Sequence, residues 1–86
     1  MAYKLFYKSS VEKDLKGLPK ERKAKILKKI EKDLAMDPKG KGKPLKGKWK
    51  GLWRYEVWPY RVIYSISTDS ILILRIRHRK EVYRKH

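Results

Sequence analysis

The 86-residue chain contains no cysteine, no asparagine and no glutamine. Without cysteine, neither a disulfide framework nor a thiolate metal site nor a catalytic thiol can form. Proteins from very hot organisms are depleted in thermolabile amides and enriched in charged residues, so this composition predicts a thermophilic source. A thermal unfolding midpoint in the ordinary mesophilic range would contradict that prediction.

Long apolar runs are also lacking, and no stretch approaches the length of a membrane span. No signal-like segment precedes the first predicted strand. A chain of this length buries one modest core. We therefore expect a single cytoplasmic domain over residues 1–86 with no membrane partner.

Acidic residues are scarce: nine Asp and Glu oppose 25 Lys and Arg, for a net charge of +16. The excess is uneven, with 11 basic and 6 acidic side chains in residues 1–37 but 14 basic and 3 acidic in residues 38–86. Self-repulsion at this charge opposes folding, so the charge points to a polyanionic partner, and nucleic acid is the first candidate. The alternative is a lysine-rich surface that only keeps the protein soluble.

Two amphipathic helices are predicted after an alternating strand at residues 3–7. Ser9 and Glu12 have the spacing of a capping box at the start of the first helix. The second runs from Pro19 to about residue 36, because Asp37 precedes a proline and disfavours further helix. The two apolar faces comprise Val11, Leu15 and Leu18, then Ile26, Leu27, Ile30 and Leu34. The basic face of the second helix either contacts RNA or is simply solvated.

The rest of the chain predicts a surface loop and three strands. Residues 38–48 alternate lysine with glycine and proline, which cannot form a core. Strands follow from Gly51 to Trp58 and over residues 60–67 and 71–78, joined by short turns. We therefore predict a small α+β domain in which an N-terminal strand and a helical hairpin pack on an antiparallel sheet of about four strands, with a short C-terminal helical turn.

Conventional catalytic motifs are absent: the glycines have the wrong spacing for a phosphate loop, and histidines and carboxylates are few. A metal-dependent nuclease is therefore disfavoured, and we expect no metal and no cofactor. The last strand begins with four aliphatic residues and ends in cations, which places charge at an edge of the sheet. Arginine, tyrosine and histidine suit a metal-free ribonuclease, because RNA supplies its own 2′-hydroxyl nucleophile.

Three segments resemble the RelE/ParE toxin superfamily: Leu-Lys-Gly…Gly-Leu-Trp-Arg within residues 45–54, Tyr-Arg-Val-Ile-Tyr at 60–64, and His-Arg-Lys-Glu-Val-Tyr at 78–83. The resemblance covers nearly the whole chain. It implies a toxin that enters the ribosomal A site and cuts mRNA without metal, leaving a 2′,3′-cyclic phosphate and a 5′-hydroxyl. It also implies a RelB-like antitoxin that wraps the toxin in a hetero-oligomer, the free toxin being a monomer.

The resemblance also implies roles for individual residues. Arg61 matches a phosphate-binding arginine, Arg77 an acid or phosphate ligand, and Tyr83 a tyrosine that orients the nucleotide. Arg54 stands where RelE proper has the first of two lysines, and His78 falls near a histidine that some relatives use as general acid. The expected RNA-binding side chains are Lys43, Lys46, Lys48, Lys50 and Arg79.

Several alternatives stay open at this point. Glu56 replaces the second lysine of RelE proper, and it is either the general base or an ion-pair partner of Arg54 or Arg61. His78 could be a packed histidine, Arg79 a surface charge or antitoxin contact, and Tyr83 a docking aromatic. Of the tryptophans, Trp53 is expected in the core and at least one of Trp49 and Trp58 under the loop, although all could stack on bases.

Three functions compete. The first is the ribosome-dependent mRNA endonuclease. The second is a ParE-like toxin that poisons DNA gyrase without cutting nucleic acid, against which the presence of Arg61, Arg77 and Tyr83 argues. The third is a ribosome- or RNA-binding module of the same fold that has lost its chemistry.

Overall fold

The structure is a computed structural model that describes residues 2–80. The expected C-terminal helical turn lies largely, and Tyr83 wholly, outside the described residues. The described elements are β1 (Lys4–Tyr7), α1 (Ser9–Lys16), α2 (Lys20–Lys29), a π-helical turn (Ile30–Leu34), α3 (Pro38–Lys41), β2 (Lys43–Pro44), a 3-10 turn (Gly47–Trp49), β3 (Trp53–Val57), β4 (Tyr60–Ile66) and β5 (Ser70–His78). The predicted α+β class is confirmed.

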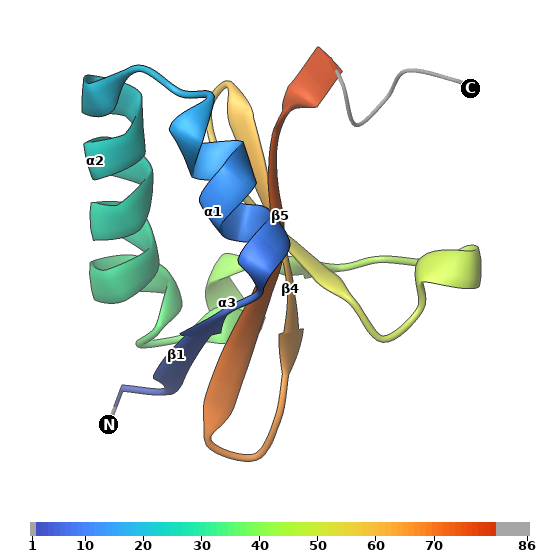
Figure 1. Ribbon diagram of the computed structural model, residues 1–86. Coiled ribbons are helices and arrows are strands. Elements are labelled where there is room, and N and C mark those ends of the chain that lie inside the picture. The colour runs from blue at the N-terminus through green and yellow to red at the C-terminus, as the bar shows by residue number, and fades with distance from the viewer. Residues whose placement is uncertain (1, 81–86) are drawn as a thin grey trace.

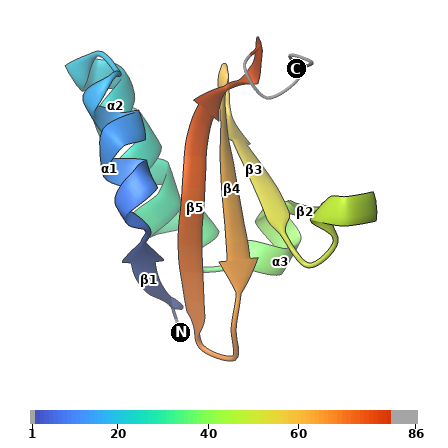
Figure 2. The same cartoon turned by 45° about the vertical axis from the view of Figure 1, so that its right-hand side comes forward.

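The strands form one five-stranded sheet in the order β1-β5-β4-β3-β2 (Figure 2). The prediction of an antiparallel sheet of about four strands was wrong in two respects. β2 adds a fifth strand, and β1 pairs with β5 in parallel, whereas the other pairs are antiparallel. A two-residue strand inside a lysine-rich loop leaves no periodic signal, and alternation cannot reveal the direction of a neighbour.

Both long helices cover the same face of the sheet (Figure 1). The predicted apolar faces supply the helical half of the core, and alternate residues of the strands supply the other half. The buried core residues are Val11, Leu15, Ile26, Ile30, Leu34, Val57, Val62, Tyr64, Ile71, Ile73 and Ile76. Among the described residues, no helix has the length and apolarity needed to span a bilayer. We call the opposite face of the sheet the open face; neither α1 nor α2 covers it.

Both helices depart from the predicted boundaries. α1 begins at Ser9 with Lys8 as its N-cap and no side-chain cap, so the predicted capping box is wrong. The helix that was expected to reach residue 36 becomes π-helical after Lys29, where the Ala35 N–H donates to Ile30 O at 2.9 Å. The core residues Ile26, Ile30 and Leu34 are spaced four apart, which is more than one turn of an α-helix, so their side chains would shift progressively around the helix. A π-helical turn contains more residues and keeps them on one face.

The segment expected to be an irregular loop contains real structure. The Asp37 side chain accepts a hydrogen bond from Gly40 N at 3.0 Å and caps α3, whose first residue is a proline. Tyr64 Oη donates to Pro38 O at 2.6 Å inside the protein. β3 begins at Trp53 and not at Gly51, since Gly51 has a φ of 99° and cannot continue a strand.

A β-bulge in β5 sets the orientation of its cationic end. Tyr64 pairs with Ile73 but Ile63 pairs with Arg75, so Leu74 is the extra residue. One extra residue exchanges the two faces of a strand. Ile71 and Ile73 point into the core before the bulge and Ile76 after it. The bulge thereby brings Arg77 to the same face as Arg61.

Candidate functional site

Three predicted site residues lie in one row across the upper sheet. Glu56 of β3 pairs with Arg61 of β4, and Arg61 pairs with Arg77 of β5. Directly opposed residues on neighbouring strands share a face, so all three start from the open face. Residues far apart in the sequence are thus held side by side by the strand register.

Glu56 and Arg61 form a tight ion pair, with 2.5 Å between Oε2 and NH2. The Arg61 side chain is only 5% exposed, whereas that of Glu56 is 48% exposed. The hydrogen bond from Arg61 holds the pKa of Glu56 below its ordinary value, and the charges of Arg54 and Arg79 act in the same direction. We call these four residues the Glu56 group. The pairing alternative for Glu56 therefore describes this structure, and a lowered pKa makes the carboxylate a weaker base.

A second carboxylate, Asp14 of α1, was not singled out in the sequence. Its Oδ2 accepts hydrogen bonds from Arg75 Nε at 3.1 Å and from the Ile76 backbone N–H at 2.9 Å, while Oδ1 accepts from Arg75 NH2 at 3.1 Å. Arg77 Nε lies 3.8 Å from Oδ1. Asp14 is 9% exposed and both arginines are 41% exposed. These four residues are the Asp14 group.

The Asp14 group closes the edge of β5 where β1 ends. The last backbone bond of that edge runs from Lys8 N to Ile73 O, and beyond it Ser10 Oγ donates to Leu74 O at 2.9 Å. Ser10 and Asp14, four residues apart, therefore replace a neighbouring strand with side chains. A signal for this arrangement was present in the sequence: Ser10 directly precedes the buried Val11, and Asp14 directly precedes the buried Leu15 one turn later.

A hollow of about 380 Å³ opens beside the Asp14 group. Its lining consists of Asp14, Gly17, Leu18, Tyr60, Arg75, Ile76, Arg77 and His78. The rings of Tyr60 and His78 meet edge to face at 5.5 Å. His78 Nδ1 accepts a hydrogen bond from Lys80 N at 3.2 Å, so a neutral ring carries its proton on Nε2. The hollow thus combines exposed cations with a hydrogen-bond donor.

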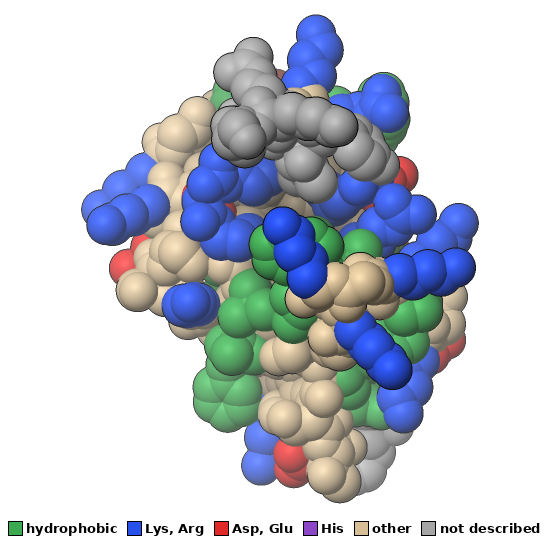
Figure 3. All heavy atoms as spheres, turned by 90° about the vertical axis from the view of Figure 1, so that its right-hand side faces the viewer, with side chains coloured by type: hydrophobic (Ala, Val, Ile, Leu, Met, Phe, Trp, Pro, Cys, Tyr) green, Lys and Arg blue, Asp and Glu red, His purple; other side chains and the backbone are tan. Residues whose placement is uncertain are grey.

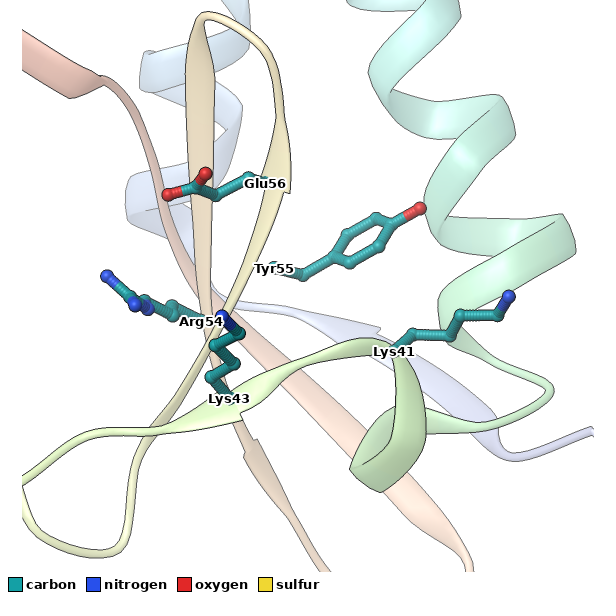
Figure 4. A pocket seen from close by; sticks show the side chains of 5 residues that line it. All are labelled: Lys41, Lys43, Arg54, Tyr55 and Glu56. Carbon is teal, nitrogen blue, oxygen red and sulfur yellow. The ribbon is translucent and has the colours of Figure 1, made fainter.

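A smaller hollow of about 180 Å³ lies at the edge of β3, above the short β2. Lys41, Lys43, Arg54, Tyr55 and Glu56 line it (Figure 4). Tyr55 points toward the helices, while Arg54 and Glu56 point to the other side of the strand (Figure 4). Arg54 and Lys43 are register partners, and with Glu56 the hollow brings together three predicted site residues.

The remaining predicted residues are more dispersed. The loop that carries Lys46, Lys48 and Lys50 projects from the sheet on the side away from the helices (Figure 1). Arg79 lies over the Trp58 ring at 4.6 Å. Lysine and arginine side chains outnumber acidic ones across the face that Figure 3 presents. Within residues 2–80, no three His, Cys, Asp or Glu side chains gather in a way that could hold a metal ion.

The tryptophans are only partly as predicted. Trp53 packs against the core, with its ring stacked on Tyr64 at 6.5 Å. Trp49 is 56% exposed and Trp58 is 63% exposed, so neither is buried under the loop. For Trp49 the prediction failed because Gly47 and Gly51 turn the loop outward and do not fold it back over the sheet, and Trp58 lies in the turn between β3 and β4, where Arg79 and not the loop lies over its ring.

Known proteins match this chain over almost its full length. A family profile described as "ParE toxin of type II toxin-antitoxin system, parDE" matches residues 5–83. A protein named Toxin RelG, from Mycobacterium tuberculosis, is 30% identical over 87 residues, covering 99% of this chain and 100% of the relative.

Solved structures agree with the sequence matches. The toxin–antitoxin complex RelBE2 of M. tuberculosis contains a chain with a TM-score of 0.87 and 28% identity, covering 91% of this chain and 99% of that one. The RelE–RelB complex of Pyrococcus horikoshii matches with a TM-score of 0.65 and 27% identity over 92% and 97% of the two chains. The chain therefore belongs to the ParE toxin family of the RelE/ParE superfamily and is a toxin of a type II toxin–antitoxin system.

Proposed function

We propose that this toxin is a metal-independent endoribonuclease that cuts mRNA in the ribosomal A site. The 2′-oxygen of the nucleotide forms a bond to its own phosphorus while the bond to the 5′-oxygen of the next nucleotide breaks. The 2′-hydroxyl loses its proton to a base, and the departing 5′-oxygen gains one. The observation that carries the proposal is the register pair Arg61–Arg77 on the open face. His78 follows Arg77, pairs with Tyr60 from the other face of the sheet, and lines the same hollow as Arg77. Well-placed donors to the developing charge are each worth about 3 kcal/mol of barrier.

Arg77 makes the first contact with the phosphate in this proposal. Its side chain is 41% exposed and its Nε faces the anchored carboxylate of Asp14 at 3.8 Å. A guanidinium fork matches two phosphate oxygens. Arg54, on the neighbouring hollow, approaches the same charge from β3.

Arg61 joins by exchanging partners. In the free protein the Arg61 guanidinium donates to the Glu56 carboxylate. A phosphate could take the place of this carboxylate, because both anions present paired oxygens at similar spacing. Glu56 is the exposed partner of the pair and can leave, whereas Arg61 is held in the sheet. We therefore propose that Glu56 is the ion-pair partner of Arg61 in the free toxin and not the general base.

His78 supplies a proton or a hydrogen bond to the leaving oxygen. The Lys80 N–H at Nδ1 favours the tautomer with a proton on Nε2, which leaves Nε2–H available as donor. Tyr83, outside the described residues, would orient the nucleotide. Phosphates along the strand would contact Lys43, Lys46, Lys48, Lys50 and Arg79.

The partner that controls the toxin is proposed to be a cognate, acidic antitoxin in a hetero-oligomer, with the free toxin a monomer. A net charge of +16 favours a complementary acidic surface, and the two solved relatives described above are chains of toxin–antitoxin complexes.

Inducible expression with primer extension on a reporter mRNA tests the nuclease. Wild type is expected to arrest growth and leave codon-aligned cuts, and Arg61→Ala/Arg77→Ala to abolish both. Arg22→Ala/Lys25→Ala, which removes equal charge from exposed positions of α2, is the control and retains cutting. Arrest without cuts in the wild type would refute the proposal. No arrest and no cuts would leave a binding module.

Gyrase poisoning is the second candidate, because the matching family is described as the ParE toxin. It requires no phosphate clamp. Inhibition of DNA supercoiling by the purified chain, unchanged in Arg61→Ala/Arg77→Ala, would select it over the nuclease.

A further inference from the structure

The loop between β2 and β3, residues 45–52, is built to hold its tip outward. Leu45 N donates to Leu52 O at 2.9 Å and closes its base. Gly47 and Gly51 have positive φ angles of 67° and 99°, which allow both reversals. At the tip, Lys50 N donates to Gly47 O at 3.0 Å and Leu52 N to Trp49 O at 3.1 Å. We call this segment the tryptophan loop.

The tip of the tryptophan loop displays one large aromatic ring among lysines. Trp49 is 56% exposed, and Lys48 Nζ lies 5.5 Å from its ring centroid. Lys46, Lys48 and Lys50 are exposed, and residues 45–52 contain no acidic side chain. The loop stands clear of the sheet in two views (Figures 1 and 2). A tryptophan held in water by a hydrogen-bonded turn contributes little to the core. What sets this ring apart from other exposed aromatic side chains is the set of lysines around it, which gives the tip an aromatic face and positive charge together.

The chemistry of this tip matches an unpaired nucleobase joined to phosphates. An indole stacks on the flat face of any base, and neighbouring ammonium groups attract the flanking phosphates. A duplex keeps its bases stacked on one another and offers no free face. An acidic protein would satisfy the lysines but would not need the exposed ring.

We propose that Trp49 stacks on an unpaired base of single-stranded RNA while Lys46, Lys48 and Lys50 hold the adjoining phosphates. This inference rests on the proposed function only in taking RNA as the ligand. It does not require that the chain cut RNA, because the loop lies apart from Arg77 and His78. The base could belong to messenger or to ribosomal RNA, which share this chemistry.

Binding to a fluorescent single-stranded RNA of about 12 nucleotides, measured by anisotropy at several salt concentrations, tests the stacking. Trp49→Ala is expected to weaken binding about tenfold without changing the salt dependence, because no charge is lost. Trp49→Phe keeps a ring and retains most of the affinity. Lys48→Ala is expected to make the plot of log K against log salt shallower, reducing the magnitude of its negative slope by about one.

Phe6→Ala is the matched control, since Phe6 is 55% exposed on β1 and lies in another part of the sheet. Phe6→Ala is expected to bind the single-stranded RNA with the affinity of the wild type. On duplex RNA of the same length, Trp49→Ala is likewise expected to match the wild type. Equal affinity of Trp49→Ala and wild type for the single strand would overturn the proposal. So would a loss confined to the antitoxin complex, which would make the loop a protein contact.

Ultraviolet crosslinking of the Arg61→Ala/Arg77→Ala chain to translating ribosomes identifies the RNA. A crosslink that depends on Trp49, to either messenger or ribosomal RNA, supports stacking, and the absence of any such crosslink opposes it. Failure of the nuclease proposal would be seen separately, as a wild type that binds RNA through Trp49 but leaves no cuts.

Discussion

Two carboxylates hold arginines at the same end of the sheet, but the burial of acid and base is reversed between them. Asp14 is 9% exposed and presents Arg75 and Arg77, each 41% exposed. Glu56 is 48% exposed and covers Arg61, which is 5% exposed. The buried member of each pair is fixed by the fold. We therefore call Asp14 the anchor of two exposed cations and Glu56 the cover of a buried one.

The largest effect is expected from removing the anchor. Asp14→Ala leaves the Ile76 N–H and the Arg75 guanidinium without their acceptor, so we expect the free energy of unfolding to fall by about 3 kcal/mol. Asp14→Asn keeps one oxygen for the Ile76 N–H and is expected to lose about half as much. Urea unfolding followed by circular dichroism measures both values.

Asp69→Ala is the control for this prediction. Asp69 pairs with Lys4 at 3.8 Å, and both side chains are more than 70% exposed, at 71% and 72%. Exposed pairs are worth about 0.5 kcal/mol. If Asp14→Ala cost no more than Asp69→Ala, Asp14 would be a surface charge and the contrast between the two groups would disappear.

Removing the cover is expected to change binding more than stability. Glu56→Gln keeps an oxygen for Arg61, so we expect a loss of only about 1 kcal/mol in the free energy of unfolding. The same change gives Arg61 a neutral partner that a phosphate displaces more easily, and it removes one negative charge, so affinity for single-stranded RNA should rise severalfold. Fluorescence anisotropy with a labelled RNA measures the affinity.

Cleavage by the same variant separates the two readings of Glu56. A general base cannot be replaced by an amide without a large loss of kcat. A cover can, and kcat/KM is then expected to hold or rise. A fall in kcat of more than about a hundredfold with unchanged affinity would return Glu56 to the base role.

The pH dependence of stability provides a finer test. Arg61 holds the pKa of Glu56 below its ordinary value, so the unfolded chain takes up this proton first on acidification. The stability from the pair is therefore complete above the unfolded pKa, about 4.3, and is lost as pH falls through the lower folded pKa. The difference between wild type and Glu56→Gln is expected to be constant near neutral pH and to shrink as the pH falls below the ordinary pKa of a glutamate. If the difference in the free energy of unfolding were the same at acidic and at neutral pH, the lowered pKa of Glu56 would be contradicted.

Periodicity predicted much of this arrangement. The apolar stripes of the helices and the alternation of β4 place the core correctly, because burial imposes those periods directly. The register of Arg61 with Glu56 follows from a short hairpin link, and their ion pair is one of the alternatives that the sequence indicates. The remaining candidate site residues come from the resemblance to the family and stay predictions.

What periodicity could not predict depends on partners distant in sequence. Asp14 reads as an ordinary helical acid until β5 lies beside it, 62 residues later. The bulge at Leu74 is visible only as a change of phase, from Ile71 and Ile73 to Ile76, and its effect on Arg77 requires the paired strand. The outward turn of Trp49 depends on backbone angles at Gly47 and Gly51 that composition leaves free.

The smallest expected effect is the coupling between the two groups. Asp14 pairs with Arg75 and Arg77 and Glu56 with Arg61, although Arg61 and Arg77 are direct neighbours in the register. In a double-mutant cycle of Asp14→Asn and Glu56→Gln, the free energies of unfolding should add to within about 0.5 kcal/mol. For cleavage the two changes should not add. In the proposed mechanism Glu56→Gln alone holds or raises kcat/KM, but once Asp14→Asn has misaligned Arg77, Arg61 no longer shares a phosphate with it and that gain is expected to disappear. Additivity in both measurements would mean that the anchor and the cover serve separate ligands.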